Sequence, residues 1–302
     1  MLIDLIERYL SLRQTLGFTL RDPSRPLRAF AQFAADTGDT HIRAATAVAW
    51  ASAASSPSVR HVRLRNIIHL ARFLHAEDPR HEVPSNPFRA STQRPQPYIY
   101  TPEEIARLVA AAQRLRDSYP LRRQVYATLI GLIAATGLRV SEALDLCFCD
   151  VLPEGVLQIR RTKFGKSRLV PLHPTATTAL GRYLELRRGL PVTDDHLFLS
   201  AGNRRIGSSM VEYTFGRMRR LAGIAPARTR PPRIHDLRHT VATRALEQCP
   251  TDRAAVARHF VALATYLGHT DITHTYWYLE ATPELMTGLA DAAETLFGRG
   301  EV

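Results

Sequence analysis

The last quarter of the chain gathers side chains that can grip an anion and move protons. From Arg233 to Glu280 the sequence reads R-I-H-D-L-R-H, a helical interval, and then L-G-H-T-D-I-T-H-T-Y-W-Y-L-E. Guanidinium groups bind anions at any physiological pH, and imidazole and phenol groups transfer protons. Any one of these residues alone could be a solvated or packing residue, so the interpretation depends on the rest of the chain.

Two earlier segments carry further cations in constrained positions. Arg139 lies in a tight turn between a predicted helix at about 121–135, which should end at Gly137, and another that begins near Val140. The only lysines of the chain, Lys163 and Lys166, flank a turn that joins two predicted strands, 156–161 and 168–172. A strand-joining turn can reach a ligand, so both lysines are candidates for contact with one.

Taken together, these motifs resemble the tyrosine recombinases, or phage integrase family, of the Xer-like or mobile-element type. The segments that carry the resemblance are Ala135-Thr-Gly-Leu-Arg139-Val-Ser-Glu-Ala-Leu144, Lys163 through Pro171, His235-Asp-Leu-Arg238-His-Thr240, and Leu267-Gly-His269 followed by Tyr278. The order of the motifs and the intervals between them agree with the family. The resemblance covers residues from about 98 to 290.

The resemblance implies a metal-free and ATP-independent reaction on DNA, with no cofactor. Tyr278 would attack the scissile phosphorus and hold a 3′-phosphotyrosine, and Arg139 and Arg238 would clamp the non-bridging oxygens. It further implies that Lys163 protonates the leaving 5′-oxygen and that His235 assists proton transfer at the tyrosine. By the same resemblance His269 hydrogen-bonds the phosphate, and Glu142 orients Arg139.

Some of these assignments have competitors nearby. Lys166 lies on the same turn as Lys163, and Tyr276 lies close to Tyr278; on a helix the two tyrosines point about 200° apart, so only one can face the site. The nine-residue interval after His269 favours Tyr278. The long interval before His269, and Leu-Glu after Tyr278, depart from the commonest family pattern and favour a mobile-element branch.

Composition agrees with a polyanionic partner. The chain has 302 residues, a formal net charge of +12 and 45% hydrophobic residues, which indicates two folded domains and a soluble, basic protein. The chain has three cysteines, Cys147 and Cys149 in a C-x-C pattern and Cys249 alone, and this arrangement predicts no disulfide framework. Charges from Asp4 onward and the lack of a long apolar run predict a cytoplasmic, nucleoid-associated protein without a signal peptide or membrane span.

The expected fold is mainly α with a small β-sheet. Residues 1–78 should form a helical, SAM-like core-binding domain, 79–99 a proline-rich linker, and 100–302 a mixed α/β catalytic domain. Expected helices are 2–17, 26–37, 42–54, 57–76, one from Thr101, 174–188, 208–222, 236–248, 252–266 and 284–297. The last could dock on its own domain or on a neighbouring protomer. Expected DNA contacts are Arg60, Arg63, Arg65, Arg72, Lys166 and Arg168.

Recombination requires four strand cuts on two duplexes, so the expected partners are a double-stranded DNA site and a homotetramer assembled on it, with other recombinases or accessory proteins as further candidates. Integration, excision, inversion and transposition all fit. Rival functions are a DNA-binding protein that keeps the fold without the reaction, a type IB topoisomerase-like activity and, remotely, a zinc hydrolase that uses His235 and His239 at helical i, i+4 spacing.

Overall fold

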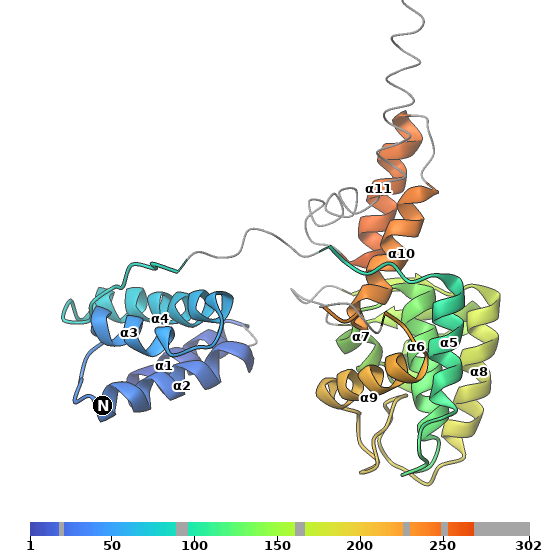
Figure 1. The fold of residues 1–302 in the computed structure, drawn as a ribbon, viewed down its shortest axis with the longest axis horizontal. Helices are drawn as coiled ribbons and strands as arrows, with labels where there is room; N and C mark the ends of the chain where they lie inside the picture. Colours follow the sequence, from blue (N-terminus) through green and yellow to red (C-terminus); the bar gives the residue numbers. More distant parts are fainter. Residues whose placement is uncertain (18–20, 89–95, 161–166, 226–229, 249–252, 269–302) are drawn as a thin grey trace, which may run out of the picture. The chain divides into compact units, whose positions relative to one another are not determined.

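The computed structural model (Figure 1) describes residues 1–17, 21–88, 96–160, 167–225, 230–248 and 253–268. The chain splits into two compact units, Met1–Pro95 and Gln96–Val302, and each has its own hydrophobic core. Several sequence-predicted features lie outside the described residues: Lys163, Lys166, His269, Tyr278 and the helix expected at 284–297. None of the helices in the described ranges combines the length and hydropathy that a membrane span needs.

Unit 1 is a bundle of helices whose apolar faces meet in one core. Its helices are α1 Leu2–Thr15, α2 Arg21–Asp36, α3 Ala44–Ser52 and α4 Pro57–Glu77. The expected start of the second helix at Pro26 is wrong, because α2 begins at Arg21 and contains that proline. Pro26 lacks one backbone donor, and burial of Leu27 and Phe30 against the core offsets the loss.

Both ends of the predicted linker 79–99 are built into folded structure. On unit 1, the Ile42 N–H donates to Nδ1 of His81 at 3.0 Å. On unit 2, the Tyr100 N–H donates to Oγ1 of Thr240 at 2.9 Å. These bonds pair residues far apart in sequence, so they fix each end of the stretch to its own unit.

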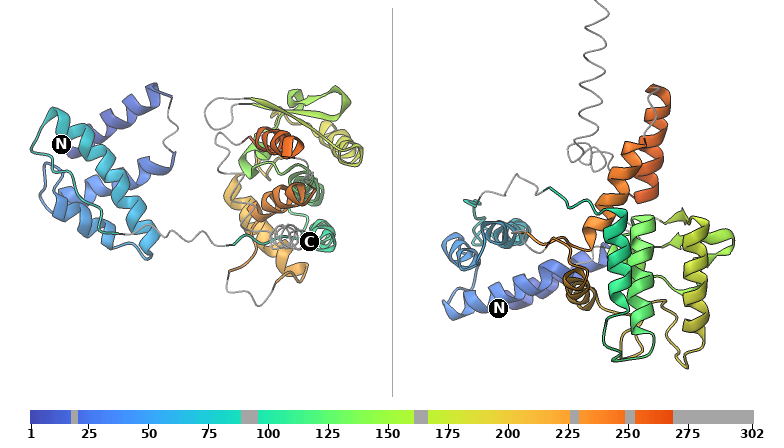
Figure 2. Two further views of the ribbon diagram at one scale, coloured as in Figure 1. Left: turned by 90° about the horizontal axis from the view of Figure 1, so that it is seen from above. Right: turned by 45° about the vertical axis from the view of Figure 1, so that its right-hand side comes forward.

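Unit 2 combines helices with a small antiparallel sheet beside α11 (Figure 2). Its helices are α5 Pro102–Ala112, α6 Arg122–Thr136, α7 Val140–Leu144, α8 Pro174–Arg188, α9 Ser208–Leu221, α10 His235–Glu247 and α11 Arg253–Leu267. The strands, in sheet order, are β1 Val151–Leu152, β2 Val156–Ile159 and β3 Arg168–Pro171. Leu157 of β2 pairs with Val170 of β3, and both side chains are buried in the core.

The core of unit 2 is centred on α6, which packs against α5, α8 and α10. Val125, Leu129 and Ile133 repeat at helical spacing on its buried face, which drives this packing. α10 and α11 lie side by side in Figure 1 and share a smaller core made by Leu246, Leu263 and neighbouring residues. In this fold α6 contacts α7 and α10, α10 contacts α11, and α11 contacts β3 of the sheet.

Candidate active site

The turn between α6 and α7 holds Arg139 in a fixed backbone setting. Gly137 ends α6 in the left-handed region (φ 65°), and its N–H donates to the Ile133 carbonyl at 2.8 Å. A Cβ at Gly137 would lie 3.1 Å from Leu267, so the position requires glycine for its φ and for the close approach of α11. Arg139 then caps α7, and its N–H donates to Oε2 of Glu142 at 3.0 Å.

Arg238 comes from α10 and lies one turn after His235, the first residue of that helix. It is only 2% exposed, and a buried guanidinium requires hydrogen-bond acceptors. Its Nη1 donates to the Gly137 carbonyl and its Nη2 to the Leu267 carbonyl, each at 2.7 Å. Arg238 therefore ties α10 both to the turn that carries Arg139 and to the end of α11.

Three arginines from different segments converge on the C-terminal end of α11. They donate to three consecutive carbonyl oxygens: Arg168 to Tyr266 at 2.8 Å, Arg238 to Leu267 at 2.7 Å, and Arg139 to Gly268 at 3.0 Å. A helix C-terminus leaves its last carbonyls without intrahelical partners and carries partial negative charge, which favours cations there. The sequence-predicted pair Arg139 and Arg238 is thus brought together at the two residues before His269.

Glu142 links two of these arginines. Its Oε1 accepts from Nη1 of Arg139 at 2.7 Å, and its two carboxylate oxygens accept from Nη1 and Nη2 of Arg168 at 3.0 and 2.8 Å. Burial by itself would raise the pKa of Glu142, but hydrogen bonds and charge from Arg168, and then from Arg139, lower that pKa to about 2. Glu142 is therefore a carboxylate at any working pH and lies where it can orient Arg139.

Arg168, one of the expected DNA contacts, has its guanidinium bonded within the protein. Its side chain is 9% exposed, and Nε, Nη1 and Nη2 each donate to the protein. Because β3 turns Arg168 toward α7 and α11, the guanidinium lies inside the unit and not on its surface. An arginine among strand residues looks the same in sequence whether its partner is a phosphate or a buried carboxylate.

His235 is set up as a neutral imidazole. His235 is exposed at the start of α10, yet the protein around its ring desolvates it enough to lower the pKa of the imidazole, and the nearby charges of Arg238 and Arg233 lower that pKa further. At neutral pH the ring therefore has a free lone pair and can accept a proton. The ring of His239 lies edge-on to it, with centroids 4.8 Å apart, and burial lowers the pKa of His239 to about 4.

On unit 1, part of the predicted basic surface is exposed along α4. Arg65, His69 and Arg72 follow one face at i, i+4 and i+7 spacing, and all three are exposed. Partial burial lowers the pKa of His69, and the charges of Arg65 and Arg72 add to this effect. The stripe therefore presents two permanent cations around an imidazole whose pKa is lowered by partial burial and by these cations.

Arg60 and Arg63, which were expected beside them, contact their own unit. Nε of Arg60 donates to the Ala54 carbonyl at 2.8 Å, and the Arg63 guanidinium lies 4.9 Å from the centre of the Trp50 ring. Both side chains are partly exposed. They can still add positive potential to the face, but each already has a partner in the fold.

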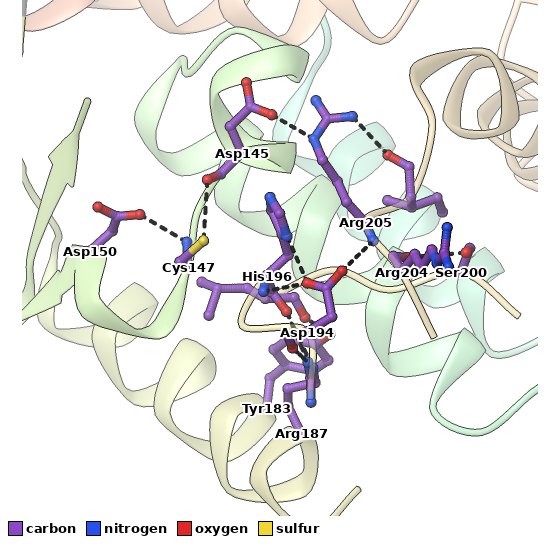
Figure 3. Close-up of polar contacts among 12 residues, drawn as sticks. Asp145, Cys147, Asp150, Tyr183, Arg187, Asp194, His196, Ser200, Arg204 and Arg205 are labelled. Carbon is purple, nitrogen blue, oxygen red and sulfur yellow. Dashed lines mark hydrogen bonds and ion pairs between the residues drawn. The ribbon is translucent and has the colours of Figure 1, made fainter. Parts of the chain in front are cut away.

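The far end of α7 is fixed by the loop after α8 (Figure 3). Arg205 donates from Nε to Oδ1 of Asp145 at 2.5 Å, and its N–H donates to Oδ2 of Asp194 at 3.3 Å. The other oxygen of Asp194 accepts the N–H of His196 at 2.9 Å. The motifs in the sequence gave no sign of this network, which secures α7, the short helix that Arg139 caps.

One group in unit 1 has the composition of a metal site. Within the described ranges, potential ligand atoms of His41, Asp78 and His81 lie within 4.8 Å of one another. However, Nδ1 of His81 accepts the Ile42 N–H, which places the proton of the neutral ring on Nε2 and leaves no lone pair for an ion. The cluster fits hydrogen bonds that close the end of unit 1 better than it fits metal coordination.

Comparison with known proteins was made with both the sequence and the fold. The sequence profile of the phage integrase family matches residues 99–284. A putative integrase/recombinase of Sinorhizobium fredii is 37% identical and covers 93% of each chain. Tyrosine recombinase XerD of Caulobacter vibrioides is 31% identical over 80% of this chain and 76% of its own.

Solved structures share the fold at lower identity. The Tn1549 transposon integrase in complex with transposon right-end DNA has a TM-score of 0.65 and 19% identity, and the alignment covers 99% of each chain. A lambda integrase tetramer bound to a Holliday junction has a TM-score of 0.64 and 19% identity, over 92% of this chain and 76% of that one. The mainly helical fold with a small sheet is confirmed by these matches, and they do not favour a zinc hydrolase. The chain belongs to the phage integrase family and is a tyrosine-type site-specific DNA recombinase.

Proposed function

We propose that this recombinase moves a mobile genetic element by cutting and rejoining DNA through a 3′-phosphotyrosyl bond at Tyr278. The observation that carries the proposal is the meeting of Arg139 and Arg238 at the carbonyls of Gly268 and Leu267, directly before His269 in sequence. Two guanidiniums held by rigid helix ends supply the charge neutralisation that attack on a phosphodiester requires.

The arginines act on the phosphate oxygens. Each guanidinium has five N–H donors in a planar fork, so one that keeps its protein bonds still has donors for a non-bridging oxygen. Glu142 holds Arg139 from behind through Nη1, which fixes the plane of the guanidinium. The guanidiniums of Arg139 and Arg238 then stabilise the negative charge that develops on the oxygens of the pentavalent phosphorus, and they need not rearrange to do so.

Proton transfers complete the step. The Tyr278 oxygen bonds to phosphorus as the bond from phosphorus to the 5′-oxygen breaks; His235, whose lowered pKa keeps its imidazole neutral, takes up the tyrosine proton. Lys163, or Lys166 three residues further along the chain, gives a proton to the 5′-oxygen, and His269 hydrogen-bonds the phosphate. The phosphotyrosyl bond keeps the backbone energy, so the reverse attack by a 5′-hydroxyl rejoins the strand without ATP.

DNA engagement is assigned to both units. We assign unit 1 as the helical core-binding domain, with Arg65 and Arg72 on the exposed face of α4 as phosphate contacts, and unit 2 as the catalytic domain. Recombination of two duplexes requires four such sites, so the working assembly is a homotetramer on DNA, with accessory proteins selecting the direction. A DNA-associated location in the cell follows from this role.

The test traps the covalent intermediate. Randomly nicked fragments of the genomic DNA that carries the gene are incubated with tagged protein, and DNA that stays attached after SDS treatment is sequenced. We expect recovery of a defined site, often as an inverted repeat, with wild type and Tyr276→Phe but not with Tyr278→Phe. No Tyr278-dependent adduct despite site-specific binding would instead indicate a DNA-binding protein. Adducts at unrelated sequences, together with relaxation of any supercoiled plasmid, would indicate a topoisomerase.

A further inference from the structure

Arg168 connects segments that the reaction must keep in register. It is the first residue of β3, and its guanidinium donates to both carboxylate oxygens of Glu142 and to the carbonyl of Tyr266. A planar guanidinium makes these bonds from three separate nitrogens, whereas an ammonium would have to reach all the acceptors from a single nitrogen. Arg168 therefore joins the sheet, α7 and the end of α11 through one side chain.

The same carboxylate also holds Arg139. Oε1 of Glu142 accepts from Nη1 of Arg139 at 2.7 Å and from Nη1 of Arg168 at 3.0 Å, so the two guanidiniums share one oxygen. If Arg168 were removed, Glu142 would lose its bidentate partner and could rotate toward solvent or take up a proton. Arg139 would then keep its charge but lose the fixed orientation of its guanidinium.

The end of α11 packs closely against this side chain. A Cβ built on Gly268 would lie 2.6 Å from Nη1 and 2.8 Å from Cζ of Arg168, so the glycine backbone lies directly against the guanidinium. The Gly268 carbonyl in turn accepts from Arg139 at 3.0 Å. Arg168 thus packs against Gly268, and Arg139 bonds its carbonyl.

We propose that Arg168 is a positioning residue for DNA cleavage. It locks Glu142 and the C-terminal end of α11 together, so that Arg139 meets the scissile phosphate in one orientation. The inference rests on the proposed recombinase function and assigns Arg168 no contact with DNA, in contrast to the expectation from sequence.

The experiment separates positioning from DNA binding. The probe is a synthetic duplex of the recovered site, nicked beside the cleavage point, and the variants are Arg168→Gln, Arg168→Lys and, as control, Arg160→Gln. Arg160 lies just after β2, is 47% exposed and pairs with Asp150 away from Glu142. We expect covalent adduct formation to slow about 10–100-fold in Arg168→Gln and less in Arg168→Lys, as for a small misplacement of a catalytic group. The dissociation constant for the duplex should change less than about 2-fold, because no phosphate contact is lost.

The pH profile supplies a readout that a loss of fold would not mimic. The charged groups that face Glu142 are Arg168 from β3 and Arg139 from its own turn; Tyr266 of α11 lies beside Arg168, and burial raises the pKa of its phenol. Without Arg168 the largest influence that lowers the pKa of Glu142 is lost, so the carboxyl pKa rises above its value in the wild type. The cleavage rate of Arg168→Gln should therefore fall at low pH, over a range in which the wild-type rate does not change. The double variant Glu142→Gln/Arg168→Gln should not show this fall at low pH, because it has no carboxyl group to protonate. It should also cleave no more slowly than the slower of the two single variants.

The outcomes are distinct. If wild type forms no Tyr278-dependent adduct, the proposed function fails. If wild type forms it and the folded Arg168 variants cleave at the wild-type rate with the wild-type pH profile, the positioning role fails. A weakened dissociation constant with unchanged cleavage of bound duplex would restore Arg168 to the DNA contacts. Should Arg168→Gln not fold, Arg168→Lys keeps a cation beside Glu142 and carries the same rate and binding comparison.

Discussion

Arg139 donates from Nη2 to the backbone carbonyl of Gly268 at 3.0 Å, across 129 positions of sequence. The bond joins the turn after α6 to the last described residue of the α11 segment. It makes the orientation of Arg139, which we propose binds the scissile phosphate, depend on the backbone at Gly268, and this dependence can be tested.

Substitution of Gly268 by alanine should impair cleavage beyond any effect of backbone strain. Its φ of +68° disfavours a side chain, and the new Cβ would meet Arg168, which three hydrogen bonds hold in place. Gly223→Ala is the matched control, because its φ is +64° and nothing lies within 4 Å of the built Cβ. We expect both variants to lose about 1–2 kcal/mol of unfolding free energy from strain, and only Gly268→Ala to lose more and to cleave slowly. Equal losses in stability and rate would contradict the contact.

Replacement of Arg238 by lysine should remove most cleavage but leave DNA affinity. A single ammonium cannot span the Gly137 and Leu267 carbonyls and also bind a phosphate oxygen. The expected fall in adduct formation is about 10²–10³-fold, the effect of losing one donor to a developing charge. Arg244→Lys is the control, because Arg244 lies on the same helix but bonds the Tyr100 carbonyl. The Arg244→Lys protein should cleave DNA near the wild-type rate. Nearly equal rates for the two variants would remove Arg238 from the phosphate clamp.

Stability should fall in acid because of the histidines at the start of α10. The folded-state pKa of His239 is lowered to about 4 by burial, while an unfolded histidine titrates near pH 6.5. The unfolded state therefore binds the proton first, so stability is fully present above about pH 6.5 and is lost as pH falls toward 4. The slope is at most about 1.4 kcal/mol per pH unit for this residue. Urea unfolding, followed by hydrogen exchange in α10 peptides, should show a shallower slope in His239→Gln; an unchanged slope would contradict the assignment.

Charge on α4 should set affinity and not chemistry. Arg65→Ala and Arg72→Ala should each weaken DNA binding across all sequences and reduce the slope of log affinity against log salt by about 1. Arg28→Ala is the control, because it removes the same charge from α2, where Arg28 pairs with Glu7 of α1. Cleavage of saturated complexes should be unchanged. If Arg28→Ala shifts the salt slope as much, net charge and not the α4 face governs binding.

Helix ends were predictable where their signals are local. Thr101 caps α5, with its Oγ1 accepting the Glu104 N–H at 3.2 Å and Glu104 returning a bond to the Thr101 N–H at 3.1 Å, as the Thr-Pro-Glu-Glu run predicts. Gly137 ends α6 because a left-handed residue favours glycine. Both features depend on residues within one turn of chain, which the sequence displays directly.

Partners set by tertiary structure could not be predicted in the same way. Arg168 was expected on DNA, since nothing in β3 reveals that Glu142 and Tyr266 lie beside it. Arg187 on α8 is 2% exposed and bonds the carbonyls of Asp194 and His196, again with no sequence signal. β1 is two residues long and exists only because it pairs with β2. The residues of the site could be inferred from the order of the motifs. The hydrogen bonds among them could be found only from the three-dimensional structure.

The bonds that build unit 2 also bear on how the protein is made. Thr240 and Arg244 of α10 bond the backbone of Tyr100, across 140 and 144 positions, whereas the bond from Ile42 to His81 in unit 1 spans 39. A nascent chain can therefore complete the helical unit while most of the polypeptide is still unsynthesised, but it cannot assemble Arg139 with Arg238 until α10 and α11 have left the ribosome. A truncated translation product of this gene would therefore carry a folded helical unit without the segments that bring Arg139 and Arg238 together.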